Sequence, residues 1–226
     1  MKWINLESPN VRAQELEYQE FRYPILSRHY LSVPCAVTNP PFFAVTERRK
    51  SVRQFKSLTI DRLNALLWHA ARSISLLPPQ NGERWQHRPT PSAGGKHPVD
   101  VFVVDCSKKE KSVLLYSPVS HSLSELKIYK EPLIEFLQLL AEVLPTQNAT
   151  IIWFGAQFER TLSKYENGES LIWRDAGALS ATLAFTAEAL EINCCLLGPT
   201  GEPFFSKIFG DNKTILGVGG MYVGER

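Results

Sequence analysis

The sequence predicts an α+β fold, with a mixed central sheet surrounded by helices and preceded by an irregular N-terminal arm. Two apolar, β-branched runs indicate buried strands, at 99–105 and 149–155. Apolar residues recur at helical spacing through 60–74, 131–144 and 171–191, which indicates three amphipathic helices. No segment repeats.

The first 43 residues have no periodic pattern and contain prolines at positions 9, 24, 34, 40 and 41. Proline removes a backbone donor and blocks long regular elements, so we expect residues 1–43 to form an arm over the domain or over a partner chain. Residues 44–226 are expected to form one domain. Its first segment, 44–56, is basic and predicted to be extended, and Thr59 or Ser57 is expected to cap the first helix.

The other elements follow in chain order. A loop containing Pro and Gly is expected at about 77–97, and a second strand at 113–117. The long helix at 171–191 carries small residues that allow another helix to approach closely. Beyond it we expect a strand at 193–197, a short helix at 203–209 and a Gly-rich last strand at 214–223.

Composition limits the class of protein. The 226 residues are 44% hydrophobic and 21% charged, which suits one sizeable globular domain. A net charge of +2 gives no reason to invoke nucleic acid or an acidic membrane surface. No apolar run reaches the roughly 20 residues of a membrane helix, and the N-terminus lacks the apolar core of a signal peptide. A cytoplasmic protein is therefore expected.

The four cysteines, at 35, 106, 194 and 195, form no C-x-x-C pair, and no His/Cys set has zinc-ligand spacing. We expect no metal site. Cys194 and Cys195 lie inside an apolar run and are expected to be buried strand residues, with a redox role as the alternative.

Two segments have residue types that suit a phosphorylated ligand. Arg49, Ser51 and Arg53 stand at i, i+2 and i+4, which places them on one side of an extended segment. Two guanidinium groups and a hydroxyl on one face suit a phosphate. The alternative is an ordinary solvated basic face.

The second segment is Pro91-Ser92-Ala93-Gly94-Gly95. Its residues are small, and the glycines permit positive φ and a close approach of the backbone to a flat ligand. The alternative is a plain surface turn.

Together these segments resemble the nitroreductase superfamily: Arg-Lys-Ser-x-Arg-x-Phe, a Leu-rich helix, then Pro-Ser-Ala-Gly-Gly and a hydrophobic strand. The resemblance implies a nitroreductase-like fold that binds FMN, usually as a homodimer with the flavin at the subunit interface. It implies that Arg49, Lys50, Ser51 and Arg53 hold the phosphate end. It places Pro91, Ser92, Ala93 and Gly94 at the flavin edge.

The Pro-Ser-Ala-Gly form of the loop is similar to the SagB-type branch, whose members resemble dehydrogenases that oxidise peptide azolines to azoles by hydride transfer to flavin N5. The segment from Phe158 to Tyr165 is similar to that branch too, and the resemblance makes Lys164 and Tyr165 the catalytic pair. A Lys with its charge reduced by burial, or a Tyr assisted by that Lys, could be the base. The alternative is an exposed pair in a polar loop.

Some residues depart from the family pattern. Lys96-His97-Pro98 stands where the family usually has Leu-Tyr-Pro, and Ala178 stands where the branch commonly has His. The turn at Leu197 and Gly198, which would run along the flavin, is only loosely similar. Two other functions therefore stay open: an NAD(P)H-dependent nitro- or quinone reductase, and a degenerate member acting as a partner or scaffold in a biosynthetic complex.

Overall fold

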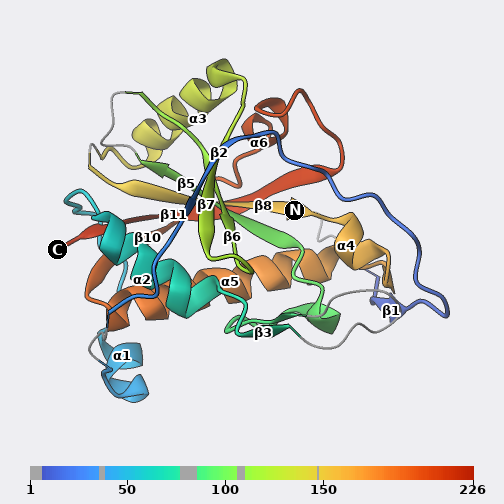
Figure 1. Cartoon of the computed structure of the whole chain (residues 1–226), viewed down its shortest axis with the longest axis horizontal. Coiled ribbons are helices and arrows are strands. Elements are labelled where there is room, and N and C mark those ends of the chain that lie inside the picture. The colour runs from blue at the N-terminus through green and yellow to red at the C-terminus, as the bar shows by residue number, and fades with distance from the viewer. Residues whose placement is uncertain (1–6, 36–38, 77–85, 106–109, 147) are drawn as a thin grey trace, which may run out of the picture.

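The computed structural model describes residues 7–35, 39–76, 86–105, 110–146 and 148–226 (Figure 1). The strands are β1 (Asn10–Val11), β2 (Ile25–Tyr30), β3 (Ser75–Leu76), β4 (Gln86–His87), β5 (Val99–Asp105), β6 (Leu114–Ser117), β7 (Ser122–Leu126), β8 (Thr150–Gln157), β9 (Tyr165–Glu166), β10 (Ile192–Leu197) and β11 (Ile215–Glu225). The helices are α1 (Phe42–Arg48), α2 (Ile60–Ala71), the 3₁₀ turn η1 (Ala93–Gly95), α3 (Lys130–Val143), α4 (Glu159–Leu162), α5 (Glu169–Ala189) and α6 (Phe204–Lys207).

A seven-stranded sheet forms the centre of the molecule, in the order β10-β11-β8-β5-β6-β7-β2. The α+β class is confirmed, but the sheet is not mixed, because every described pairing in it is antiparallel. The short β6–β7 connection explains part of this, since a tight turn can join only antiparallel neighbours. Strands β8 and β10, which follow α3 and α5 in the chain, also run antiparallel to the strands beside them.

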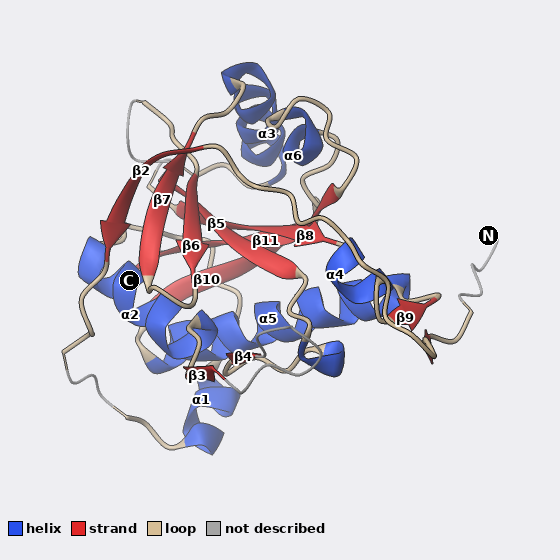
Figure 2. Cartoon of the chain, turned by 45° about the vertical axis from the view of Figure 1, so that its right-hand side comes forward, coloured by secondary structure: helices blue, strands red, loops and turns tan. Residues whose placement is uncertain are grey.

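Helices cover both faces of the sheet, so the molecule has three layers with a hydrophobic core on each side of the middle one (Figure 2). On one side α2 and α5 pack against the sheet through residues such as Leu66, Leu183 and Ile152. On the other side α3 and α6 bury Phe136 and Phe205. The predicted strands at 99–105 and 149–155 are almost wholly buried, because helices cover both of their faces.

The predicted helices at 60–74, 131–144 and 171–191 are confirmed as α2, α3 and α5 with small shifts at their ends. The prediction of an extended 44–56 is wrong for its first part, since residues 42–48 form α1. Val45 is buried there, and the ring of Phe42 packs near that of Phe185 on α5, at a centroid distance of 6.3 Å. Tertiary packing of these apolar residues stabilises the helix. The basic residues that follow it gave the sequence no apolar periodicity from which a helix could be predicted.

The first 43 residues are not irregular throughout. β2 pairs with β7 and becomes an edge strand of the central sheet, and β1 pairs with β9. Both strands fit between prolines, because Pro9 precedes β1, and β2 lies between Pro24 and Pro34. The division of the chain at residue 44 stays a prediction. No helix in the described ranges is long and apolar enough to span a membrane.

The tight packing of β8 against α6 generates a stability prediction. A Cβ added at Gly155 would overlap the buried ring of Phe205, so Gly155→Ala should lower the free energy of unfolding by about 1–3 kcal/mol. A Cβ added at Gly177, in the exposed face of α5, meets nothing within 4 Å. Gly177→Ala should therefore stabilise the protein by about 0.5–1 kcal/mol. Urea unfolding of both variants tests this, and an unchanged midpoint for Gly155→Ala would contradict the described packing.

Candidate functional site

The predicted phosphate segment follows α1 and runs beside the start of β10. The Val52 N–H donates to the Cys194 carbonyl at 2.9 Å, and the Asn193 side-chain amide donates to the Gln54 carbonyl at 2.9 Å. Because β10 is an edge strand of the sheet, these bonds tie the segment to a free edge. The backbone from 49 to 55 is therefore held in place while its alternate side chains are left available.

The basic side chains of this segment have no acidic partner in the described part of the chain. Arg49, Lys50, Ser51 and Arg53 make no side-chain hydrogen bond or ion pair there, and all but Arg49 are exposed. Arg48, by contrast, pairs with Glu188 at 3.4 Å. Burial raises the pKa of the Cys194 thiol to about 12, and the positive charge of Arg49 opposes that rise. Four donors without a described anion on one segment suit a phosphate group.

The other predicted residues on this edge are Leu197 and Gly198, which end β10. Leu197 is half-buried against the core on the α6 side, and Gly198 is exposed with nothing within 4 Å of an added Cβ. The same strand therefore carries the phosphate segment at its start and the predicted flavin turn at its end. Cys194 and Cys195 are buried strand residues, as predicted.

The loop at Pro91–Gly95 is anchored by one carboxylate on α5. The Ser92 hydroxyl donates to Asp175 Oδ2 at 2.5 Å, and the Ala93 N–H donates to Oδ1 at 3.0 Å. The Ser92 oxygen in turn accepts the His97 N–H at 2.8 Å. These three bonds fix both ends of the loop, so it is not a plain surface turn.

The predicted catalytic pair lies directly against this loop. Lys164 Nζ donates to the Gly94 carbonyl at 3.4 Å, and a Cβ added at Gly94 would stand 2.6 Å from the Tyr165 hydroxyl. Gly94 also has a φ of 59°, in the region that favours glycine. Gly94 and Lys164 are 70 positions apart in the chain, and the fold brings the loop and the predicted catalytic pair together.

The N-terminal arm holds the pair in place. The Arg12 N–H donates to the Lys164 carbonyl at 2.9 Å, and the Arg12 side chain donates to the Leu162 carbonyl at 2.9 Å. Strand β1 also pairs with Tyr165 and Glu166 in β9. Both predicted catalytic side chains are half-buried, which argues against an exposed pair in a polar loop.

Two residues that support the site were not predicted. Asp175 is only 7% exposed. In the sequence, it could have been found as a carboxylate that lies on the buried face of the helix, with Ile172 and Ala176. Arg160 donates to Asp100 at 2.8 Å, to Glu20 at 2.7 Å and to the His97 carbonyl at 3.3 Å. Burial alone would lower the pKa of Arg160, but the two carboxylates outweigh it and raise that pKa.

The two predicted parts of the site lie near opposite ends of α5. Asp175, in its first turns, holds the Pro91–Gly95 loop, whereas Glu188, in its last turn, pairs with Arg48 beside the phosphate segment. At about 1.5 Å of rise per residue, these anchors are roughly 20 Å apart along the helix axis. Within one chain, the residues of the phosphate segment lie together, and so do the Pro91–Gly95 loop and the predicted catalytic pair. The segment and the loop themselves are held at opposite ends of α5.

Comparison with known proteins identifies the fold. Residues 46–225 match the model of the nitroreductase family. A structure of a protein assigned to the nitroreductases, from Ralstonia eutropha JMP134, is 19% identical with a TM-score of 0.65, over 94% of this chain and 97% of that one. A sequence comparison with curated proteins gave no significant match.

Two other solved structures have the same fold. The Escherichia coli microcin synthetase McbBCD complex, with truncated pro-MccB17 bound, contains a chain that is 18% identical with a TM-score of 0.59, over 88% of this chain and 78% of that one. A nitroreductase-like protein from Desulfovibrio desulfuricans, in complex with FMN, is 14% identical with a TM-score of 0.51, over 83% and 87%.

The anchoring role of Asp175 predicts a pH effect. Burial raises the pKa of this carboxyl, and the hydrogen bonds from Ser92 and Ala93 oppose the rise. A carboxyl with a higher pKa in the folded state contributes stability at low pH, which is lost as the pH rises through that pKa. Asparagine does not titrate, so the free energy of unfolding of Asp175→Asn, relative to the unsubstituted protein, should increase from about pH 3 to about pH 7.

Urea unfolding at a series of pH values measures this difference. Asp61→Asn, which removes an exposed carboxylate from α2, controls for the loss of one negative charge. A relative stability of Asp175→Asn that stays constant or falls as the pH rises would contradict the burial argument.

Proposed function

This chain belongs to the nitroreductase family, and from that premise we propose that it is an FMN-dependent oxidoreductase of the SagB type, which oxidises a heterocycle such as a peptide azoline. The contact of Lys164 and Tyr165 with Gly94 is the observation that carries the proposal. This contact joins the Pro91–Gly95 loop to the segment at 164–165, whereas an ordinary surface turn would make no such long-range contact.

The phosphate end of FMN would be held by Arg49, Lys50, Ser51 and Arg53. The fit rests on charge and on position, because these donors have no described anionic partner and stand on a segment bonded to an edge strand. Leu197 and Gly198, at the other end of that strand, would lie along the flavin. When bound, FMN supplies the acceptor for the hydride that leaves the heterocycle.

The flavin edge would be bordered by Pro91, Ser92, Ala93 and Gly94. Oxidation of an azoline to an azole removes one hydride and one proton from carbon, so the site needs a base beside the ring. Lys164 and Tyr165 are proposed for that role, with the Lys164 ammonium 5.9 Å from the centre of the Tyr165 ring. Both side chains are half-buried, which limits the access of water to them.

We propose that a second copy of the chain completes each site. The roughly 20 Å between the two parts along α5 exceeds what one loop movement spans, whereas a homodimer would set the phosphate edge of one chain against the Pro91–Gly95 loop of the other. The exposed face of α5 supports this, since Ala181 presents only a methyl group to an approaching helix and Gly177→Ala would add no more than that.

The likeness to a chain of the McbBCD microcin synthetase supports a place in a biosynthetic complex, with a peptide or a small molecule as substrate. We propose the cytoplasm as its location.

FMN binding tests the phosphate assignment. The double variant Arg49→Gln/Ser51→Ala should lower FMN affinity by about 100-fold, because two hydrogen bonds to a charged group are lost. Lys130→Gln removes an exposed cation from α3, on the other face of the sheet, and should change the affinity little. Quenching of FMN fluorescence measures both. Unchanged affinity in the double variant would reject these residues, and no flavin binding by the parent protein would favour a scaffold role.

Azoline oxidation tests the catalytic pair. Lys164→Met should lower the rate on a thiazoline-containing peptide by about 100-fold or more, the range for loss of a general base, while FMN affinity stays within about threefold. Lys130→Met, on the far layer of the molecule, is the matched control. Full activity of Lys164→Met would remove Lys164 from the mechanism. Rapid reduction of bound flavin by NAD(P)H alone would favour a nitro- or quinone reductase instead.

A further inference from the structure

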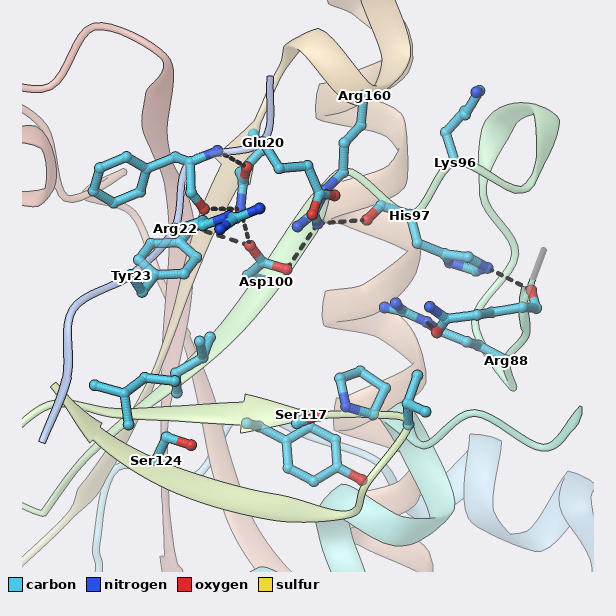
Figure 3. Close-up of a pocket in the computed structure, with 18 of the residues that line it drawn as sticks. Glu20, Arg22, Tyr23, Arg88, Lys96, His97, Asp100, Ser117, Ser124 and Arg160 are labelled. Carbon is cyan, nitrogen blue, oxygen red and sulfur yellow. Dashed lines mark hydrogen bonds and ion pairs between the residues drawn. The ribbon is translucent and has the colours of Figure 1, made fainter. Parts of the chain in front are cut away.

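A cavity with a volume of about 670 Å³ lies beside the candidate site (Figure 3). Its walls are the N-terminal segment at 18–25, the loop residues Gly95–His97, and side chains of β5 and β6. This volume is in the range of pockets that enclose small organic ligands. None of the residues predicted to contact FMN or to act in catalysis is among its described lining residues.

Arg88 supplies the deep positive charge of this cavity. Its side chain extends from the wall into the space between Asp100 and the strands below (Figure 3). The Arg88 Nε donates to the Gln86 side chain at 3.0 Å. The two terminal nitrogens have no hydrogen-bond or ion-pair partner among the described residues.

The two described carboxylates that line the cavity near Arg88, namely Asp100 and Glu20, are bonded to other residues. Asp100 accepts hydrogen bonds from Arg160 at 2.8 Å, from the Tyr23 hydroxyl at 3.0 Å and from Gln157 at 3.0 Å. Glu20 pairs with Arg160 at 2.7 Å. The charge of Arg88 is therefore left without a close carboxylate in the described part of the chain.

Burial without such a partner is unfavourable for a cation. It lowers the pKa of Arg88 to about 10, although Asp100 opposes the change, so the guanidinium still carries its charge at neutral pH. Burial, and then Arg88 itself, lower the pKa of the adjacent His97 to about 4, which keeps that imidazole neutral. Arg88 is thus a single, partly desolvated positive charge at the inner end of the cavity.

The remaining walls combine apolar and aromatic surface with a basic mouth. Tyr116, Leu115, Pro118 and Val119 supply the apolar part. The Tyr116 hydroxyl is already bonded to His121 at 2.8 Å and the residue is only 2% exposed, so most of the apolar surface comes from the other three residues. Arg22 and Arg28, both exposed, add positive charge near the opening.

We propose that this cavity binds a small-molecule carboxylate with an apolar or aromatic body, and that Arg88 pairs with its carboxylate. A planar carboxylate matches the two terminal nitrogens of a guanidinium, and one pair neutralises one charge. The body of the ligand would then lie along Leu115, Pro118 and Val119. This site is separate from the proposed flavin site, although the two share the loop that ends at His97.

Calorimetric titration of the full-length protein, with and without FMN, tests this proposal with benzoate as the probe. Benzamide has the same shape without the charge, and inorganic phosphate has charge without the apolar body. Benzoate should bind at least about 10-fold more tightly than either, because the charge-assisted pair and the apolar wall act together. Arg88→Gln should weaken benzoate binding by about 10-fold or more, and Arg88→Lys by less.

Arg48→Gln removes an exposed arginine that does not line the cavity and is the matched control, expected to change the affinity less than about threefold. Ser117→Trp fills the cavity from β6 and should also abolish binding. Removing an uncompensated buried charge is not expected to destabilise the fold, so Arg88→Gln should unfold at a temperature no lower than that of the parent protein. Three results would overturn the proposal: no benzoate binding in the millimolar range, equal affinity for benzamide or phosphate, or unchanged benzoate affinity in Arg88→Gln.

Discussion

The arrangement of the candidate site depends on one carboxylate, Asp175, which is buried in α5 and accepts hydrogen bonds from the Ser92 hydroxyl and the Ala93 N–H. This contact joins a core helix to a loop of small residues that has almost no side-chain surface to pack. Fixing the loop at Ser92 places Gly94 where Lys164 and Tyr165 can contact it, and it orients the backbone toward His97, whose carbonyl Arg160 then binds. A charged group taken out of water is unfavourable unless it is hydrogen-bonded, so the carboxylate and the loop stabilise each other.

Helix α5 separates the parts of the proposed flavin site. Its first turns hold the Pro91–Gly95 loop, and its last turn holds Arg48 beside the phosphate segment. The two anchors stand roughly 20 Å apart along the axis of this helix, so α5 holds the phosphate segment and the loop of one chain apart. In the proposed homodimer, the exposed small residues of α5 would leave room for a second copy. The cavity at Arg88 lies beside the loop that Asp175 anchors, so one short segment borders both proposed ligand sites.

Much of the fold could be predicted from sequence, because apolar periodicity reports burial directly. The strands at 99–105 and 149–155 and the three long helices follow from that signal. Strand β7 was missed because its buried serines resemble a loop, and α1 was missed because basic residues follow its short apolar face. The site segments were found from their residue types and from a resemblance. Their anchors, Asp175 and Arg160, act through partners more than 60 positions away in the chain, and no local pattern encodes such pairing.

Complementation between two inactive variants tests the central claim, that each flavin site is built from two copies of this chain. One copy would carry Arg49→Gln/Ser51→Ala, and the other Lys164→Met/Tyr165→Phe. In a mixed dimer, one site receives all four substitutions and the other receives none. After unfolding and refolding together in equal amounts, the two variants should recover about a quarter of the parent azoline-oxidising activity, the statistical share of intact sites. Activity no higher than that of the separate variants, from a mixture in which mixed dimers are present, would contradict a site shared between chains.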